Sequence, residues 1–272
     1  MIHLRSIALD SNRTLPDKFP FNVPVIQLLE TIEFTSPITF FVGENGSGKS
    51  TLLELIGVAA NLPTIGSSDT DFDDTLADVR QLAKHLKWVW SKRSRNGFFM
   101  RSEDFFGFAK RVGREMAAMK RALDDEDEDN VAHKGQSKYA RGLAKMPYAR
   151  EYFAMRELYG DGLDAQSHGE SYFKLFRSRF RPGGLYLMDE PEAPLSPTRQ
   201  LTLIAMLKEM IAQDAQFIIA THSPILLAYP GATIYNFDDG QIQQSAYDTL
   251  EHVVVMRGFL ENPDSYLRHL LE

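Results

Sequence analysis

One glycine-rich loop limits the fold of this chain more than any other feature. It reads Gly43-Glu44-Asn45-Gly46-Ser47-Gly48-Lys49-Ser50-Thr51, a full match to G-x-x-x-x-G-K-[ST]. The apolar run Ile38 to Val42 before it predicts a buried strand, and the run Leu52 to Ala60 after it predicts a helix. This strand, loop and helix order predicts a polyphosphate site, because the loop N–H groups and the positive end of the helix dipole then face one anion.

The residues of this loop have separate expected roles. Its glycines allow a tight turn that points successive N–H groups inward, so polyphosphate oxygens are held largely by the main chain. Lys49 is expected to reach the β and γ phosphates, Ser50 to be the hydroxyl ligand of Mg²⁺, and Thr51 to hydrogen-bond nearby phosphate oxygens. The loop therefore predicts binding of a nucleoside triphosphate with magnesium.

Two adjacent carboxylates end a second apolar run, Leu185 to Met188. Asp189 is expected to hold magnesium directly or through water, and Glu190 to polarise a water for in-line attack on the γ phosphate. Such a pair also occurs as a helix cap, but beside a phosphate loop the catalytic interpretation is favoured. The predicted chemistry is hydrolysis rather than transfer to an acceptor.

Strands alternate with helices at both ends of the chain. The apolar run Phe217 to Ala220 predicts another strand, and Pro197 to Asp214 predicts the helix before it. We therefore expect an α/β fold with a mostly parallel sheet, the fold of P-loop NTPases, built from residues 1–60 and 167–272.

The middle region, 61–166, is predicted to be an inserted, mainly helical lobe. Two apolar stripes at helical spacing are expected to be core packing. They consist of Leu76, Val79, Leu82, Leu86 and Trp90, and of Phe105, Phe108, Val112, Met116, Met119 and Leu123. The run Asp124 to Asp129 is acidic throughout, which predicts a solvated linker at 124–129, although it could equally fold back on the basic residues before it.

Charge is unevenly distributed. The net charge of -7 excludes a polycationic nucleic-acid binder, yet residues 80–121 hold twelve Lys or Arg against three Asp or Glu. This basic segment, 80–121, allows binding of DNA or of a protein partner. Trp88 and Trp90 within it could stack on bases, but core packing is the favoured interpretation.

Several other classes of function are excluded or disfavoured. The absence of Cys excludes disulfides, thiol catalysis and Cys-based metal sites, and the seven His form neither an i, i+4 pair nor H-E-x-x-H. Ser47 does not lie in G-x-S-x-G, and no N-K-x-D segment supports GTP, so ATP is the expected nucleotide. No run approaches the roughly 18 apolar residues of a membrane span, which predicts a soluble, cytoplasmic protein.

Four motifs together resemble those of ABC-type ATPases. They are the Walker A loop Gly43 to Thr51, a signature segment Ser167-His168-Gly169-Glu170-Ser171, the Walker B segment Leu187 to Glu192, and a switch-histidine segment Ala220 to Pro224. More narrowly, Asp189-Glu190-Pro191-Glu192, Leu195-Ser196-Pro197 and Thr221-His222-Ser223-Pro224 resemble the soluble RecF-like, OLD-like and SMC-related branch.

The resemblance implies an ATP-dependent homodimer paired head to tail around two ATP. Ser167 and Gly169 would contact the γ phosphate of the ATP held by the partner, Glu170 would fill the final signature position, and His222 would sense the γ phosphate. His168 departs from the family pattern, because it replaces the first of two usual glycines. Whether its imidazole crowds or contacts the phosphate is left open by the sequence.

The sequence does not single out two other elements of the family, the coupling glutamine and the ring that stacks on adenine. The coupling residue stays unassigned, with Gln81 and the turn Arg101-Ser102-Glu103 as unranked alternatives. The ring that stacks on adenine is not identified by spacing, and Phe19 and Phe21 are the nearby candidates before the loop.

Four functional hypotheses follow. The first is an ATPase that acts on a partner protein or nucleic acid, as in DNA repair or defence. The alternative is the ATP-binding subunit of a membrane ABC transporter. A P-loop kinase is disfavoured by the adjacent Asp189 and Glu190, and a nucleotide-gated binding module would show salt-sensitive binding through segment 80–121. The insertion is too short for long coiled-coil arms, and it contains no heptad run.

Overall fold

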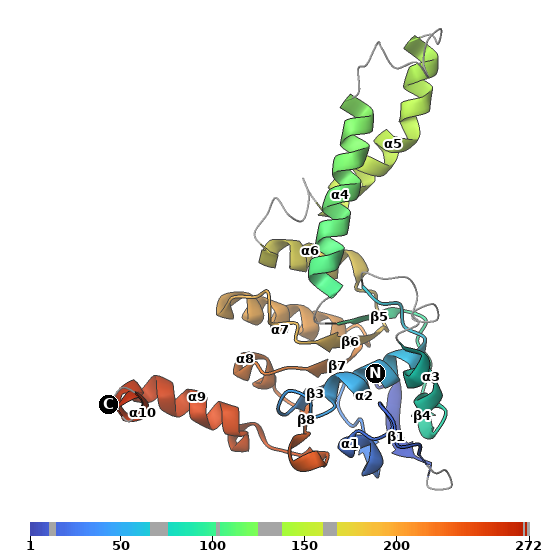
Figure 1. Cartoon of the computed structure of the whole chain (residues 1–272). Helices are drawn as coiled ribbons and strands as arrows, with labels where there is room; N and C mark the ends of the chain where they lie inside the picture. The colour runs from blue at the N-terminus through green and yellow to red at the C-terminus, as the bar shows by residue number, and fades with distance from the viewer. Residues whose placement is uncertain are drawn as a thin grey trace. The chain divides into compact units, whose positions relative to one another are not determined.

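The chain forms two compact units (Figure 1). The computed structural model describes residues 1–10, 15–65, 76–101, 104–124, 138–159, 168–268 and 270. The first unit comprises Met1–Ser102 and Phe180–Glu272, and the second comprises Glu103–Arg179. These boundaries differ from the predicted insertion at 61–166, because residues 76–101 supply strands to the sheets of the first unit and α6 (His168–Arg179) belongs to the second.

A six-stranded sheet forms the centre of the first unit. Its strands, in spatial order, are β5 (Gly97–Met100), β6 (Leu185–Asp189), β7 (Gln216–Ala220), β3 (Ile38–Val42), β8 (Thr233–Asn236) and β9 (Gln243–Gln244). The first five are parallel, and β9 runs antiparallel to β8. Every residue of β3, β6 and β7 is buried, which explains their continuous apolar sequences. The predicted α/β fold with a mostly parallel sheet is confirmed.

A smaller antiparallel sheet corrects one prediction. Its strand order is β2 (Thr31–Glu33), β1 (Leu4–Leu9) and β4 (Leu86–Trp90). The predicted helical stripe through Leu86 and Trp90 is wrong beyond α3 (Ala77–Ala83), because β4 pairs along β1 instead. Residues 86, 88 and 90 are apolar and alternate as in a strand, while residues 86 and 90 are also four positions apart, as on one face of a helix. The spacing therefore fits both the strand period and the helix period.

Both tryptophans of β4 are part of this packing. Their rings stack with centroids 6.4 Å apart, both side chains pack against the core, and the Trp88 indole N–H donates to the Ala83 carbonyl. The favoured interpretation of Trp88 and Trp90 as packing residues is therefore confirmed.

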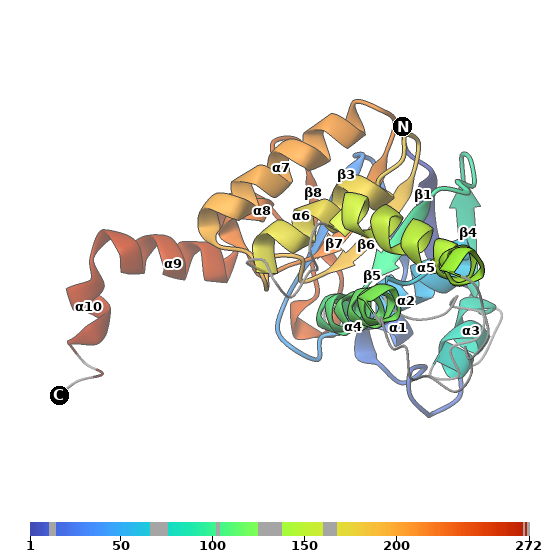
Figure 2. The same cartoon turned by 90° about the horizontal axis from the view of Figure 1, so that it is seen from above.

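Helices of the first unit connect and cover these strands. α2 (Lys49–Ala60) packs against β5, β6 and β7, and begins three residues before the predicted start. α7 (Pro197–Ile211) packs beside α8 (Pro224–Leu227), as Figure 2 also shows. The shorter or C-terminal helices are α1 (Pro24–Gln27), η3 (Asp238–Gly240), η4 (Tyr247–Thr249), α9 (Glu251–Glu261) and α10 (Pro263–Leu267).

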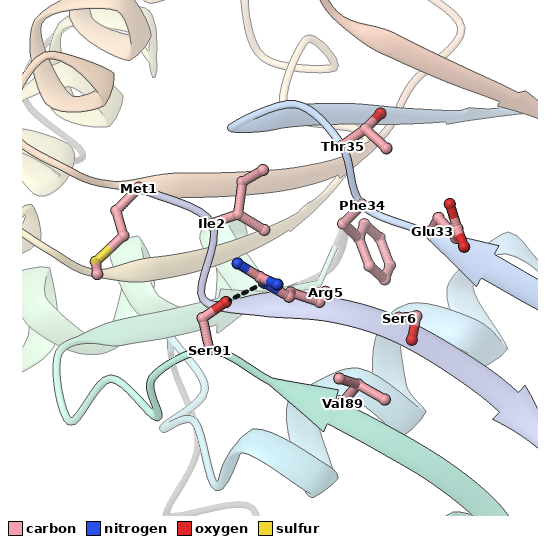
Figure 3. A pocket seen from close by; sticks show the side chains of 9 residues that line it. All are labelled: Met1, Ile2, Arg5, Ser6, Glu33, Phe34, Thr35, Val89 and Ser91. Carbon is pink, nitrogen blue, oxygen red and sulfur yellow. Dashed lines mark hydrogen bonds between the residues drawn. The ribbon is translucent and has the colours of Figure 1, made fainter.

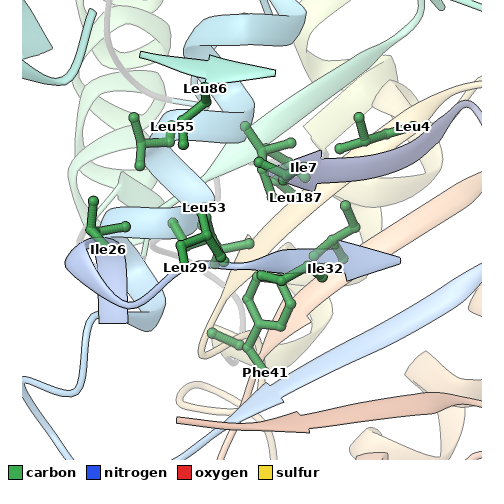
Figure 4. Close-up of a cluster of buried hydrophobic side chains, with 14 of the residues drawn as sticks. Leu4, Ile7, Ile26, Leu29, Ile32, Phe41, Leu53, Leu55, Leu86 and Leu187 are labelled. Atoms are coloured by element: carbon green, nitrogen blue, oxygen red, sulfur yellow. The ribbon is translucent and has the colours of Figure 1, made fainter. Parts of the chain in front are cut away.

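The two sheets share one hydrophobic core with α2 (Figure 4). Leu4 and Ile7 of β1, Leu53 of α2, and Phe41 and Leu187 of the parallel sheet are at most 1% exposed. Burial of such side chains contributes about 1.5–3 kcal/mol each relative to exposure. This core fixes α2, and with it the loop that precedes α2, against the sheet.

The second unit is helical. α4 (Asp104–Asp124) packs along α5 (Lys138–Tyr159), and α5 contacts α6. The second apolar stripe lies on α4 as predicted. Asp124 ends α4, whereas 125–129 of the expected acidic linker lie outside the described residues. The basic segment 80–121 is divided between the two units, with residues 80–102 in the first and 103–121 in the second.

A shallow cavity of about 590 Å³ lies on the antiparallel sheet (Figure 3). Arg5 and Ser91 line it, and the Arg5 Nε–H donates to the Ser91 Oγ at 2.6 Å. None of the predicted site residues lines this cavity. Among the described helices, none is long and apolar enough to cross a membrane.

Candidate functional site at the carboxyl edge of the parallel sheet

Three neighbouring strands bring together the predicted glycine loop, the two carboxylates and His222. β6, β7 and β3 are adjacent and parallel, so their carboxyl ends meet at one edge of the sheet. β3 continues into the glycine loop, β6 ends at Asp189, and β7 continues into Thr221 and His222. Ala220 is paired with both Asp189 and Phe41, which aligns the three strand ends.

The glycine loop has a backbone that only glycine adopts readily. Gly43, Gly46 and Gly48 have φ angles of 139°, 82° and 99°. A Cβ on Gly48 would lie 2.4 Å from the Val25 Cγ2, so this position has no room for a side chain. The Ser47 Oγ is buried and has no hydrogen-bond partner among the described residues. A cradle of this shape with an unpaired hydroxyl fits an oxygen-rich ligand such as a polyphosphate.

Lys49 holds its ammonium over this loop. The side chain is buried, and its Nζ donates to the carbonyls of Gly43 at 2.7 Å and Glu44 at 2.8 Å. Burial lowers the pKa of Lys49, whereas the nearby carboxylates of Asp189, Glu190 and Asp238 act to raise it. These carboxylates therefore oppose the effect of burial on the Lys49 ammonium.

A hydroxyl and a carboxylate at this edge fit a magnesium ion. Asp189 is buried at the end of β6, and Ser50 is exposed in the first turn of α2. Within the described ranges, no three His, Asp or Glu side chains form a group that could enclose a metal. Mg²⁺ is commonly bound by one or two protein oxygens together with phosphates and waters, which this donor set allows.

Glu190 and His222 face each other across the ends of β6 and β7. The Glu190 Oε1 lies 3.8 Å from the His222 Nε2, and the two side chains are 37% and 41% exposed. Glu190 has a φ of 48°, unusual for a residue with a side chain, and its N–H donates to the Ala220 carbonyl at 2.9 Å. The strained backbone thus presents a carboxylate that water can reach.

Glu192 is a site residue to which the sequence analysis gave no role. Its Oε1 accepts the main-chain N–H of His222 at 2.8 Å. Burial raises the pKa of Glu192, and the neighbouring Glu190 adds to this increase. The signal in the sequence was the third acidic residue of Asp189-Glu190-Pro191-Glu192.

A second tether joins the His222 loop to α7. The Ser223 Oγ donates to the Gln200 Oε1 at 2.5 Å and accepts the Leu226 N–H, which caps α8. The Gln200 Nε2 in turn donates to the Leu195 carbonyl at 3.2 Å. The turn after β6, α7 and the His222 loop are therefore one hydrogen-bonded assembly.

Two more residues at this edge come from the C-terminal part of the chain. The Asp238 Oδ1 accepts the Glu44 N–H of the glycine loop at 2.9 Å. Burial lowers the pKa of His252 on α9, His222 lowers it further, and Asp238 and Glu251 oppose these effects. The His252 Nε2 is buried and has no hydrogen-bond partner in the described part of the chain. No sequence motif marks either residue.

The signature residues belong to the second unit. Gly169 and Glu170 lie in the first turn of α6, and Ser167 lies outside the described residues. Their contact with a partner's ATP therefore stays a prediction.

The alternatives for coupling and adenine binding are placed as follows. Gln81 is exposed on α3. Arg101 follows β5 at the carboxyl edge, and its Nε lies 3.6 Å from the Glu54 Oε1 of α2, whereas Ser102 and Glu103 are outside the described residues. Phe21 is buried in the core, while Phe19 is 64% exposed, so only the Phe19 ring is open to stacking.

The raised pKa of Glu192 predicts a pH-dependent stability. A carboxyl whose folded pKa lies above its unfolded value destabilises the folded state when ionised, and this penalty disappears as pH falls through the folded pKa. Glu192→Gln removes the titration. Wild type is therefore expected to gain stability relative to Glu192→Gln between pH 7 and about pH 4.3, the unperturbed Glu value. Urea unfolding of both proteins across this range measures the difference, and a constant difference would contradict the assignment.

Comparison with known proteins agrees with this geometry. Two family sequence models match, one described as an AAA domain, at residues 24–134, and one as an AAA domain of the AbiEii toxin, type IV toxin–antitoxin system, at residues 167–228. An "Uncharacterized ABC transporter ATP-binding protein" of Haemophilus influenzae is 26% identical over 230 residues, covering 78% of this chain and 74% of the relative. The "Cobalt import ATP-binding protein CbiO" of Salmonella typhimurium is 25% identical over 227 residues, with coverage of 81% and 74%.

Solved structures also align with this chain. An ATP-binding cassette of an ABC transporter aligns over 96% of this chain and 98% of its own, with 15% identity and a TM-score of 0.49. A dimeric bacterial ABC transporter cassette aligns over 92% and 100%, with 17% identity and a TM-score of 0.45. By its sequence matches and its strand, loop and helix arrangement, the chain is a P-loop ATPase with the α/β fold of P-loop NTPases.

Proposed function

We propose that this P-loop ATPase hydrolyses ATP at the carboxyl edge of its parallel sheet, with Glu190 as the general base. One observation carries the proposal: the glycine loop with the buried Lys49 follows β3 at the same edge of the sheet at which β6 ends in Asp189 and leads into Glu190. A cation for phosphate and an exposed carboxylate for water therefore lie at one site.

Each residue of the loop has a binding role in this proposal. The loop from Gly43 to Gly48 surrounds phosphate oxygens with its main-chain N–H groups, apart from those of Glu44 and Ser47, which donate to Asp238 and to the Glu44 carbonyl. Lys49 neutralises the β and γ phosphates. Thr51 hydrogen-bonds nearby phosphate oxygens. Ser50 and Asp189 would hold magnesium, which supplies further neutralisation of phosphate charge when bound.

The hydrolysis itself is a proton transfer coupled to phosphoryl displacement. Glu190 accepts a proton from water as the water oxygen forms a bond to the γ phosphorus. The bond from that phosphorus to the β–γ bridging oxygen breaks, and ADP leaves with the electron pair. His222, beside Glu190, donates a hydrogen bond to a γ-phosphate oxygen and so senses the presence of the triphosphate.

The active assembly is proposed to be a head-to-tail homodimer. Glu190 and His222 are both more than one third exposed, so the site of a single chain is open. In the dimer the signature residues Ser167, Gly169 and Glu170 of one copy would cover the γ phosphate held by the other, as the resemblance to ABC-type ATPases implies.

Two uses of this ATPase activity compete. Both curated relatives are named as ATP-binding proteins of transport systems, which favours a subunit that works with a separately encoded membrane protein. The sequences at 189–192 and 221–224 and the match to an AAA domain of the AbiEii toxin favour a cytoplasmic ATPase acting on a protein or nucleic acid.

One experiment separates these two uses. The tagged protein is purified from detergent-extracted membranes and from the soluble fraction of the same cells, and bound proteins are identified. Stoichiometric recovery of a membrane protein supports the transporter role. The soluble role is supported instead by ATP-dependent DNA binding that weakens between about 50 and 200 mM salt, as expected for phosphate contacts from segment 80–121.

Lys49→Ala is expected to weaken ATP binding by about 100-fold or more, because the variant loses a buried charge that would make charge-assisted hydrogen bonds to phosphate. Equilibrium binding of a fluorescent ATP analogue measures the loss. Lys208→Ala, an exposed position on α7, is the matched control and should bind normally. Unchanged affinity in Lys49→Ala would reject the phosphate site.

A further inference from the structure

The loop that carries His222 is anchored by a residue of the strand next to it. Thr221 is fully buried, and its main-chain N–H donates to the Phe41 carbonyl at 3.1 Å. The next residue, His222, has an exposed imidazole, and its main-chain N–H donates to the Glu192 Oε1 at 2.8 Å. Glu192 therefore holds the main chain of His222.

We propose that Glu192 is a positioning residue for ATP hydrolysis: by accepting the His222 main-chain N–H, it holds the His222 imidazole beside the Glu190 carboxylate. This inference rests on the proposed function and adds a residue to it. Glu192 acts through His222 and does not touch the reacting atoms.

The short turn after β6 holds Glu190 and Glu192 close to each other. Glu190 and Glu192 flank the buried Pro191, and the turn is closed by N–H groups of Ala193 and Leu195 that donate to the carbonyls of Glu190 and Glu192. One turn thus presents both the proposed base and the anchor of the histidine loop. A shift of Glu192 would therefore change the 3.8 Å separation between Glu190 Oε1 and His222 Nε2.

The surroundings of Glu192 do not fit the role of a second general base. Its Oε1 is occupied by the His222 N–H, and its Oε2 is buried, with no hydrogen-bond partner among the described residues. The carboxyl group is therefore used as an acceptor. Glutamine has an acceptor oxygen at the same reach, whereas alanine has none.

The loop should stay folded when Glu192 is truncated, because two other tethers remain. The Ser223 Oγ donates to Gln200 at 2.5 Å, and the Thr221 N–H bonds to β3. Loss of the Glu192 acceptor then releases the His222 main chain locally. The consequence expected is a slower chemical step rather than loss of nucleotide binding.

Steady-state hydrolysis and equilibrium ATP binding of the full chain test this proposal in Glu192→Ala and Glu192→Gln. Glu192→Ala is expected to lower kcat about tenfold with ATP affinity within about twofold, and Glu192→Gln to retain kcat within about threefold. Glu209→Ala, an exposed glutamate on α7, is the matched control for the substitution and should behave as wild type. An unchanged kcat in Glu192→Ala would overturn the proposal.

A double variant shows whether Glu192 acts through His222. Glu192→Ala combined with His222→Ala should hydrolyse ATP no more slowly than His222→Ala alone, because the positioned group is already absent. Independent losses that multiply would indicate a general structural role and would count against the proposal.

A readout without hydrolysis separates this proposal from the proposed function. The NMR signals of the His222 imidazole should change in Glu192→Ala and be retained in Glu192→Gln, whether or not ATP is hydrolysed. If these signals change while wild type releases no phosphate, the positioning role stands and the hydrolytic function fails. If wild type hydrolyses ATP and the signals are the same in all three proteins, the positioning role fails alone.

Discussion

Replacing Glu190 by Gln is expected to lower the rate of ATP hydrolysis by at least about 100-fold while leaving ATP affinity nearly unchanged. The amide cannot accept the proton of the attacking water, but it has almost the size of the carboxylate and leaves the glycine loop untouched. Phosphate release measured under saturating Mg-ATP, together with equilibrium ATP binding, tests both parts. The backbone at Glu190, with φ of 48°, is kept by a substitution of the same length.

The control for this variant is Glu209→Gln on α7, which makes the same chemical change at an exposed position outside the site. It should hydrolyse ATP at the wild-type rate. Hydrolysis by Glu190→Gln at the native rate would show that another group accepts the proton. His222 would then be the first group to test, because its Nε2 lies 3.8 Å from the Glu190 Oε1.

A stable ATP complex of Glu190→Gln also makes the proposed dimer measurable. Solution mass should double when Mg-ATP is added, because ATP would be trapped between two copies. Adding Ser167→Arg should abolish the doubling, since a long cation would replace the small hydroxyl expected to contact the partner's γ phosphate. ATP binding without any change in mass would reject the assignment of the signature segment 167–171.

The glycine loop with its flanking strand and helix could be predicted from sequence because the pattern is local. The loop 43–51 supplies glycines, lysine and hydroxyls within one turn, and each flanking run has a single secondary structure compatible with it. β3, β6 and β7 were predicted correctly because strands buried on both faces are continuously apolar. β4 was missed because residues 86 and 90 share a face both in a helix and in a strand.

The rest of the site depends on pairing between distant parts of the chain. Asp238 reaches the Glu44 N–H across 194 positions, and Glu192 reaches His222 across 30. No periodicity encodes such contacts, because they arise only once β6, β7, β3 and β8 lie side by side. The domain boundary was misplaced for the same reason: β5 joins the central sheet through β6, which lies 85 or more residues later in the chain.

Gly97→Ala is expected to destabilise the first unit by about 4 kcal/mol or more, an effect of the size seen when a substitution has no accessible conformation. Gly97 begins β5 with a φ of 138°, and a Cβ there would lie 1.9 Å from the main-chain carbonyl oxygen of Leu185. Leu185 is its paired residue on β6, so no side chain can move to relieve the overlap. The strands would have to separate, which costs ladder hydrogen bonds as well as packing.

Gly183→Ala provides the matched control, because Gly183 also has a positive φ, 64°, but has open space where a Cβ would be added. The free energy of unfolding of that variant should fall only by the cost of a left-handed backbone at alanine, about 1–2 kcal/mol. Urea unfolding of wild type and the two variants measures the contrast, and equal destabilisation would contradict the predicted overlap at β5. Because β6 ends in Asp189 and continues into Glu190, separation of β5 from β6 should also reduce ATP hydrolysis at temperatures where the variant is still folded. Structural damage at Gly97 would thereby reach the carboxylates of Asp189 and Glu190 through one strand, without any change to the glycine loop after β3.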